Sequence, residues 1–224
     1  MVIKQVSSKS ANFTPATTDT PTDFNQNSLS VNQASILLTK GQLLAYPTES
    51  VWGIGCDAYN EAAVRRILTI KQRPIDKGMI VITDSAARIE ALLASLTPLQ
   101  RQQVLDSWHA KIADNNQAQT WLLPIPQALN RPIPSWITGE HDSVAVRVIA
   151  HPLIAQLCSQ MVSTANPFGF IVSTSCNPSG QPPATNRAEA FAYFGDEIGY
   201  LDAPTLGYIK PSQIRDALTG QTIR

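Results

Sequence analysis

The stretch QLLAYPTESVWGIGCDAYNEAAVRRILTIKQRPIDKGMIVIT, residues 42–83, joins two apolar runs through a helical pattern. The runs QLLAYP and MIVIT have the length and composition of buried strands. Between them, NEAAVRRILTI places Val64, Ile67 and Leu68 on one face of a helix, and Asn60 is a suitable N-cap. This stretch therefore predicts a strand, helix, strand unit.

The chain on the C-terminal side of this unit continues the alternation of strand and helix patterns. Strands are predicted at TWLLPI, SVAVRVI and GFIVSTS, and helices at HPLIAQLCSQM and NRAEAFAYF. Two more helices are predicted at DSAARIEALLASL, capped by Asp84, and at TPLQRQQVLDSW, capped by Thr97 with Pro98 in its first position. The pattern indicates an α/β fold in which helices flank a mixed sheet.

Composition limits the class of protein. The 224 residues are 43% hydrophobic, which is enough for a sizeable core. The 17 basic residues balance 17 acidic ones, so the net charge indicates neither a nucleic-acid-binding protein nor a disordered chain. Three cysteines without Cys-x-x-Cys spacing suggest neither a disulfide framework nor a zinc site, which fits a reducing cytoplasm. No apolar run approaches the ~20 residues of a membrane span, so no membrane association is expected.

The N-terminal segment differs from the rest of the chain. Residues 1–28 are rich in Ser, Thr, Asn and Pro without apolar periodicity, which predicts a disordered leader before a single domain, residues 29–224. A mitochondrial transit peptide is the alternative, but residues 1–30 contain no Arg and two Asp.

Three cations surround the end of the helix in the opening stretch. Because Pro74 disfavours helix at the residue before it, the helix should end near Lys71, with Arg73 and Lys77 on the following loop. Cations at a helix C-terminus stabilise it by about 0.3–1 kcal/mol without any further purpose. The alternative is a phosphate site, in which case loss of Lys71 or Arg73 should lower activity and leave the melting temperature nearly unchanged.

Polar side chains follow several of the predicted strands. IVSTSCNPSG runs from a strand into Ser175 and Asn177, and YPTES places Thr48 and Ser50 after another. Ligands commonly bind at strand ends in α/β sheets, although Asn-Pro-Ser-Gly is also strong turn chemistry. Arg147 stands in the strand pattern SVAVRV, where a charge is costly unless it is paired or faces a cleft.

The blocks YPTES-VWGIGCDA, KQRPIDKGMIVI, DSVAVRV, HPLIAQLC, STSCNPSGQPPAT and PSQIRDALTG, in this order, closely resemble the YrdC/Sua5 family. The resemblance covers nearly all of residues 30–224, and the family's Lys-x-Arg and Ser-x-Asn pairs are Lys71, Arg73, Ser175 and Asn177. It implies an open twisted sheet with a concave, positive surface. It also implies that L-threonine, bicarbonate and ATP react to give L-threonylcarbamoyladenylate and pyrophosphate, which supplies the modification of adenosine 37 in tRNA.

The resemblance also implies roles for individual residues. The pairs Lys71, Arg73, Ser175 and Asn177 are the expected catalytic set. The expected ATP-binding residues are Lys71, Arg73, Lys77, Ser143, Asn177 and Thr185. The expected threonine-binding residues are Thr48, Ser50, Arg147, Ser175 and Ser212.

No phosphate-loop motif is present, so side chains are expected to hold ATP, with Mg²⁺ bound through the ATP phosphates rather than by a protein cage. His109, His141 and His151 lack metal-ligand spacing and are interpreted as surface or capping residues. The expected downstream partners are tRNA threonylcarbamoyl-transfer proteins, and direct contact with tRNA is left open. Two other functions also stay open: an RNA-binding ribosome-maturation factor, and a paralogue of the family with a different substrate.

Three departures from the family pattern stand out. The Pro-Gly-Pro turn usual after the tryptophan near Trp108 is replaced by a longer segment without glycine, which puts substrate closure in doubt. Residues 162–170 form an insertion. Cys176 stands where alanine is usual and is expected to serve packing rather than nucleophilic chemistry.

Overall fold

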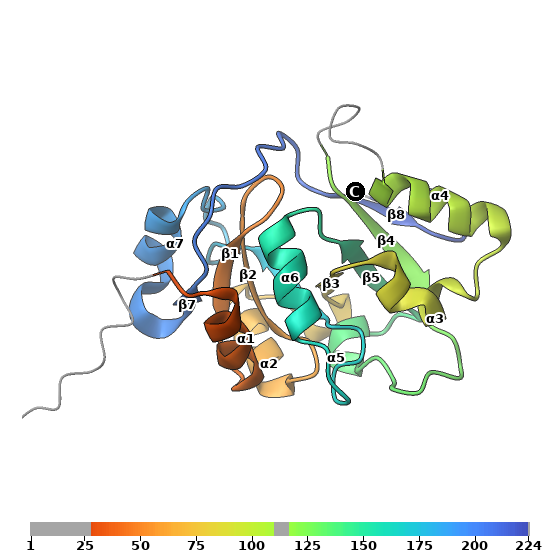
Figure 1. Ribbon diagram of the computed structural model, residues 1–224, viewed down its shortest axis with the longest axis horizontal. Helices are drawn as coiled ribbons and strands as arrows, with labels where there is room; N and C mark the ends of the chain where they lie inside the picture. The colour runs from red at the N-terminus through yellow and green to blue at the C-terminus, as the bar shows by residue number, and fades with distance from the viewer. Residues whose placement is uncertain (1–27, 110–116, 224) are drawn as a thin grey trace, which may run out of the picture.

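Eight strands form one mixed sheet in the computed structural model of the protein, which describes residues 28–109 and 117–223 (Figure 1). Their order across the sheet is β7-β1-β2-β6-β3-β5-β4-β8. The strands are β1 (Leu44–Pro47), β2 (Trp52–Asp57), β3 (Ile80–Thr83), β4 (Gln119–Pro124), β5 (Ser143–Val148), β6 (Ile171–Ser175), β7 (Gly199–Tyr200) and β8 (Gln213–Asp216).

The helices pack on both faces of this sheet. They are α1 (Val31–Thr39), α2 (Glu61–Ile70), α3 (Glu90–Leu93), α4 (Pro98–His109), α5 (Ser135–Thr138), α6 (Pro152–Gln160) and α7 (Arg187–Phe194). One core layer joins α1 and α6 to the sheet, and the opposite, larger layer includes buried residues of α2, α3, α4, α5 and α7. The predicted α/β fold with a mixed, helix-flanked sheet is therefore confirmed.

Strand direction follows the connections between the strands. β1 and β2 form an antiparallel hairpin, and β6 is antiparallel to both β2 and β3. β3 and β5 run parallel, as do β1 with β7 and β4 with β8. The central strands thus bring the loop after β1 and the end of β6 to the same region of the sheet, although these segments are far apart in sequence.

Caps account for the start of two predicted helices. The Asn60 side chain accepts a hydrogen bond from the Ala63 amide at 3.0 Å, and α2 ends with Lys71 as its C-cap, as predicted. Thr97 Oγ1 accepts from the Gln100 amide at 3.4 Å, so this residue also caps α4 as expected.

Several elements differ from the prediction. β2 lies between β1 and α2, so the opening stretch is a hairpin followed by helix and strand; its glycines, Gly53 and Gly55, weaken the strand pattern. The helix predicted at 84–96 is a 3₁₀ turn followed by the four-residue α3, and Asp84 does not cap it. Instead, Asp84 forms an ion pair with Arg88, with Nε and Oδ1 3.1 Å apart.

The interpretation of His151 as a surface or capping residue is wrong about its exposure but right about its position. Its side chain is buried and makes no cap hydrogen bond, although the residue occupies the N-cap position of α6. Its Nε2 lies 3.0 Å from the Pro204 carbonyl oxygen, so it ties the start of α6 to the chain segment that follows β7.

Ser28, which the sequence places at the end of the leader, bonds to the folded domain. Ser28 Oγ accepts a hydrogen bond from the Asp202 amide at 2.8 Å, and the Leu29 amide donates to the Tyr200 carbonyl. The remainder of the expected leader, residues 1–27, lies outside the described residues. None of the helices in the described ranges has the length and hydropathy needed to span a bilayer.

Candidate active site

Part of one sheet face forms the floor of a cleft of about 790 Å³. On this face α1 and α6 pack over Leu44, Tyr46, Ile82 and Ile171. Further along the same strands, small and polar side chains replace these apolar ones. The floor and walls include Thr48, Ser50, Gly53, Ser143, Ala145, Arg147, Ser173 and Ser175.

Strand alternation explains which side chains of β5 face the cleft. Ser143, Ala145 and Arg147 line it, whereas Val144 and Val146 point into the core on the other side. Ser143 and Arg147 therefore lie on the same face of β5.

Residues 205–212, which we call the strap, lead from the β7 side of the sheet toward β8 (Figure 1), and four of them, Tyr208, Ile209, Pro211 and Ser212, line the cleft. At one end the amides of Leu206 and Tyr208 donate to the carbonyl oxygens of Thr48 and Glu49, at 3.2 and 2.9 Å. At the other end Gln117 Nε2 donates to the Pro211 carbonyl at 2.8 Å. The strap is thus held by both walls.

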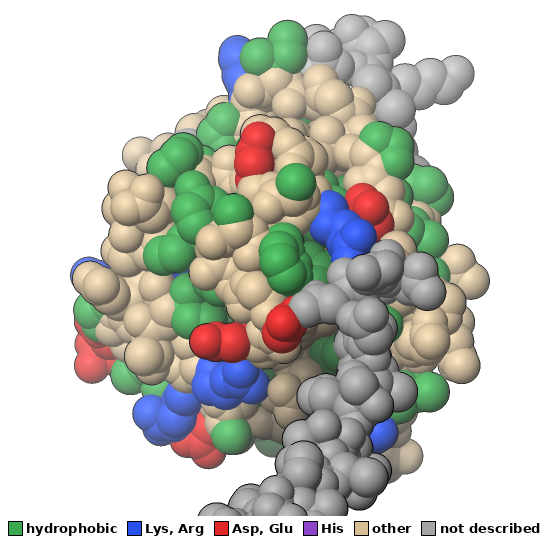
Figure 2. All heavy atoms as spheres, turned by 90° about the vertical axis from the view of Figure 1, so that its left-hand side faces the viewer, with side chains coloured by type: hydrophobic (Ala, Val, Ile, Leu, Met, Phe, Trp, Pro, Cys, Tyr) green, Lys and Arg blue, Asp and Glu red, His purple; other side chains and the backbone are tan. Residues whose placement is uncertain are grey.

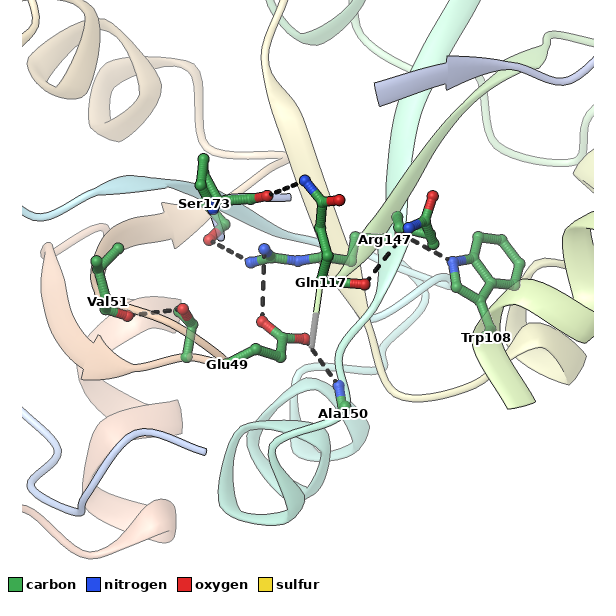
Figure 3. A network of polar contacts seen from close by, with 10 residues as sticks. Glu49, Val51, Trp108, Gln117, Arg147, Ala150 and Ser173 are labelled. Carbon is green, nitrogen blue, oxygen red and sulfur yellow. Dashed lines mark hydrogen bonds and ion pairs between the residues drawn. The ribbon is translucent and has the colours of Figure 1, made fainter. Parts of the chain in front are cut away.

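Arg147 lies at the bottom of the cleft beside a buried carboxylate (Figure 3). Its Nη1 is 3.4 Å from Glu49 Oε2, and its Nη2 donates to Ser173 Oγ at the long distance of 3.5 Å. Arg147 Nε has no hydrogen-bond partner among the described residues. Nε is itself buried, but the two Nη groups carry four N–H donors and make only one hydrogen bond within the described ranges, the long one to Ser173, so this nearly buried cation has unused capacity to bind an anion through Nη1 and Nη2.

Lys71 forms a second polar cluster that joins the end of α2 to the end of β6. Its Nζ donates to Asn177 Oδ1 at 2.9 Å and to the Asn177 carbonyl at 2.8 Å. It also reaches the Ser175 carbonyl and hydroxyl at 3.1 and 3.3 Å. Burial lowers the pKa of the Lys71 amine. The amine thus brings the Lys-x-Arg and Ser-x-Asn pairs together.

Asn177 completes this cluster. Its Nδ2 donates to the carbonyl oxygens of Pro178 and Gln181, at 3.0 and 2.6 Å, so the side chain closes the turn after β6. Both of its polar atoms are engaged within the protein, in agreement with the turn chemistry of the Asn-Pro-Ser-Gly sequence.

Arg73 and Lys77 are exposed cations on the loop before β3, and both line the cleft. Arg73 Nη2 donates to the carbonyl oxygens of Lys77 and Gly78, at 3.0 and 2.9 Å, and its Nε donates to the Gly78 carbonyl. Gly78 adopts φ +61°, a conformation that favours glycine, and the guanidinium holds this loop in place.

Most of the residues predicted for the site meet at the cleft. Those that line it are Thr48, Ser50, Arg73, Lys77, Ser143, Arg147, Ser175 and Ser212. Lys71 and Asn177 lie just behind Ser175 and do not line it. Thr185 is exposed, bonds to Glu189 at 3.0 Å, and lines a separate hollow of about 350 Å³ with Trp52 and Arg187.

The Sua5/YciO/YrdC family model, described as telomere recombination, matches residues 36–224. The chain belongs to this family. A threonylcarbamoyl-AMP synthase of Psychrobacter cryohalolentis is 66% identical over 201 residues, which cover 86% of this chain and 94% of that protein. The threonylcarbamoyl-AMP synthase of Acinetobacter baylyi is 49% identical over 195 residues, covering 87% of this chain and 96% of that protein.

Solved structures of the family agree with this fold. The P. abyssi Sua5 complexed with L-threonine is 28% identical, with a TM-score of 0.66, and the match covers 83% of this chain and 50% of that one. The chain therefore spans about half the length of that Sua5. E. coli YciO, at 17% identity and a TM-score of 0.62, shares the fold over 86% of each chain.

The residues predicted for the site did not include Glu49 or Ser173, and of the strap they included only Ser212. Glu49 stands between two predicted site residues, but nothing in the sequence reveals that its side chain turns toward Arg147. Ser173 lies two residues before Ser175 on β6, so strand alternation was the available signal. Within the strap the family resemblance assigned a role only to Ser212, because the backbone hydrogen bonds from the strap to Thr48 and Glu49 leave no motif in the sequence.

The three departures from the family pattern have different outcomes. The segment that replaces the Pro-Gly-Pro turn falls largely in residues 110–116, outside the described residues. In the insertion, Asn166 is buried; its Nδ2 donates to Asp57 Oδ1 at 3.0 Å and its Oδ1 accepts from the Phe170 amide. Cys176 is buried, and burial raises the pKa of its thiol to about 12 despite the opposing charge of Lys71.

Proposed function

We propose that this protein forms L-threonylcarbamoyladenylate from L-threonine, bicarbonate and ATP with release of pyrophosphate. Relatives that match nearly their full length are named threonylcarbamoyl-AMP synthase, and a more distant family structure holds L-threonine. The observation that carries the proposal is one cleft with two kinds of cation. Arg147 is nearly buried at its floor, and Arg73 and Lys77 are exposed at its wall.

The floor of the cleft suits the amino acid. Arg147 lines the cleft, and its Nη groups have N–H donors left for a carboxylate, where burial strengthens a charge-assisted bond. Thr48, Ser50, Ser175 and Ser212 surround it with hydroxyl groups that suit the amino group and the side-chain hydroxyl of threonine.

The wall of the cleft suits the triphosphate. Arg73 and Lys77 supply charge for phosphate oxygens, and the planar guanidinium binds such oxygens in pairs. Ser143 lies on the floor between the two ends. Asn177 and Thr185 lie outside the lining of the cleft, so in this proposal Asn177 shapes the turn that carries Ser175, and Thr185 meets only the outer part of the nucleotide.

The reaction needs alignment more than covalent chemistry. Threonine and bicarbonate first give a carbamate: the amino nitrogen bonds to the bicarbonate carbon, a C–O bond breaks, and water leaves. An oxygen of the carbamate then attacks the α-phosphorus of ATP. A new P–O bond forms as the bond between that phosphorus and the bridging oxygen breaks, and pyrophosphate leaves with the electron pair. The protein holds the two oxygens in line and neutralises phosphate charge with Arg73 and Lys77.

A magnesium ion fits this site only through the substrate. Within residues 28–109 and 117–223, no group of three His, Cys, Asp or Glu side chains gathers to hold a metal. This donor set suits Mg²⁺ bound by phosphate oxygens and waters, where the ion neutralises phosphate charge.

The product is a reactive mixed anhydride, so its consumer must be a group-transfer system. We propose that tRNA threonylcarbamoyl-transfer proteins in the cytoplasm take it onward. Seventeen basic residues balance seventeen acidic ones over the chain, and side chains of both signs appear on the face drawn in Figure 2. Strong RNA binding depends on cation–phosphate contacts, so the RNA-binding alternative is not favoured.

Pyrophosphate release from ATP tests the proposal directly. We expect release that requires both L-threonine and bicarbonate, with formation of the threonylcarbamoyl adenylate detected by mass spectrometry. Release without threonine, or with another amino acid in its place at equal rate, would point to a paralogue with a different substrate.

A further inference from the structure

Glu49 is the most buried charged side chain at the cleft, and none of the roles given above includes it. Thr48 and Ser50 on either side of it line the cleft, whereas its own side chain, 2% exposed, turns behind the floor. A carboxylate is costly to bury unless it is paired and hydrogen-bonded, so its contacts should account for its place.

Two contacts fix the position of this residue. Glu49 Oε1 accepts a hydrogen bond from the Ala150 amide at 3.0 Å, which anchors the carboxylate to the loop between β5 and α6 (Figure 3). The Glu49 carbonyl accepts from the Tyr208 amide of the strap at 2.9 Å. One residue thus connects the floor, the loop before α6 and the strap.

The second carboxylate oxygen of Glu49, Oε2, forms an ion pair with Arg147 but no hydrogen bond to it. Glu49 Oε2 lies 3.4 Å from Arg147 Nη1 but has no hydrogen-bond partner among the described residues. On the other side, Arg147 Nε is equally unpartnered. Each member of this buried pair therefore balances the charge of the other while leaving hydrogen-bonding capacity unused.

We propose that Glu49 is a positioning residue for the amino-acid substrate, holding the Arg147 guanidinium so that its remaining N–H donors meet the substrate carboxylate. This inference rests on the proposed function. Glu49 Oε2 pairs with Arg147 by charge without a hydrogen bond. It therefore balances the charge of the guanidinium and leaves its Nη donors available to the substrate carboxylate.

Two opposite effects decide what a neutral residue at position 49 would do. Removing the negative charge strengthens the attraction of Arg147 for a carboxylate, but it also frees the guanidinium to turn away. In Glu49→Gln the oxygen can still accept from the Ala150 amide, which leaves the amide nitrogen facing Arg147. Two donors then face each other, so we expect loss of orientation to dominate.

The test compares the two substrates. We expect Glu49→Gln to raise the KM for L-threonine about tenfold, about 1.4 kcal/mol, while changing the KM for ATP less than twofold. Glu140→Gln is the matched control, because Glu140 is exposed near the cleft and contacts neither Arg147 nor Ser173. If Glu49→Gln does not fold, Glu49→Asp carries the test, since it keeps the charge but cannot reach both Ala150 and Arg147; we expect the same direction.

A double-mutant cycle distinguishes positioning from a structural role. In the background of Arg147→Met, Glu49→Gln should change the KM for threonine no further. Titration calorimetry with L-threonine and with L-threoninamide, which lacks the carboxylate charge, should show that Glu49→Gln weakens the first and not the second. An unchanged or lower KM for threonine, equal changes for ATP, or additive effects with Arg147→Met would overturn the inference. Wild-type protein that binds threonine without releasing pyrophosphate would overturn the proposed function alone.

Discussion

Lys71 Nζ lies 2.9 Å from Asn177 Oδ1, and this hydrogen bond ties the end of α2 to the turn after β6. The amine also meets the carbonyl oxygens of Ser175 and Asn177. An ammonium has three N–H donors, so these acceptors already use its capacity in the substrate-free protein. Lys71 therefore shapes the Ser-x-Asn turn as well as contributing charge.

Loss of Lys71 should destabilise the protein, in contrast to the expectation from sequence that melting stays nearly unchanged. Lys71→Ala leaves partly buried acceptors without a donor, which costs about 1–3 kcal/mol. In a domain of this size that corresponds to a fall of about 2–10 °C in the melting temperature. We also expect pyrophosphate release to fall by about a hundredfold, because Ser175 loses its position.

Lys40→Ala is the matched control for this experiment. Lys40 is the exposed C-cap of α1, just as Lys71 is the C-cap of α2, so it reports the effect of a helix-end cation alone. We expect a change in stability within about 0.5 kcal/mol. Equal melting temperatures for the two variants would contradict the structural role of Lys71.

The sequence predicts those parts of the fold where one face of an element is apolar. The structure confirms the helices and strands that were predicted from apolar patterns, which are α2, α4, α6, α7, β1, β3, β4, β5 and β6. β2 was missed because a Cβ on Gly55 would meet the Val172 carbonyl oxygen at 2.1 Å. The position demands glycine through its packing, and glycine carries no strand signal.

The limits of prediction at the site have a different origin. The family resemblance assigned Arg73, Ser143 and Arg147 to the site, and strand alternation explains why Ser143 and Arg147 line the same cleft. Contacts between distant segments could not be read in this way. Whether Lys71 reaches solvent or a carbonyl, and whether Glu49 turns toward Arg147, depends on how β6 and β5 approach those residues in three dimensions.

Cys176 should be dispensable for catalysis and unreactive in the folded protein. Burial raises the pKa of its thiol to about 12, so the thiolate needed for nucleophilic attack is scarce near neutral pH. Cys176→Ala should keep turnover within a few-fold of wild type. In the wild type, iodoacetamide at pH 8 should label Cys176 only after denaturant is added.

The other buried thiols provide the comparison. Cys56 and Cys158 are also free and buried, and burial raises the pKa of each, so native protein should resist labelling at all three positions. Rapid native labelling at Cys176, or a loss of turnover above tenfold in Cys176→Ala, equal to about 1.4 kcal/mol in the barrier, would restore the nucleophile hypothesis.

The N-terminal boundary can be placed by truncation. Deleting residues 1–27 should leave melting and turnover unchanged, because that segment lacks core-forming composition. Deleting residues 1–30 should lower the free energy of unfolding by about 0.5–2 kcal/mol or more. It removes the Ser30 capping box of α1 and the Leu29 hydrogen bond to Tyr200. Identical melting of the two truncated proteins would refute this boundary.

Arg73 provides the sharpest test of the phosphate end of the cleft, because its geometry and its charge can be separated. Its guanidinium spans the carbonyl oxygens of Lys77 and Gly78 while lining the cleft, which one ammonium cannot reproduce. We expect Arg73→Ala and Arg73→Lys both to lower pyrophosphate release by about a hundredfold or more, roughly 2.7 kcal/mol of transition-state stabilisation. The KM for ATP should rise while the KM for L-threonine changes little, since Arg147 is untouched.

Arg66→Lys, on the exposed face of α2 and outside the cleft, is the control that should retain full activity. Full turnover in Arg73→Lys alone would mean that only charge is needed at this position, and full turnover in both Arg73 variants would mean that the triphosphate binds elsewhere.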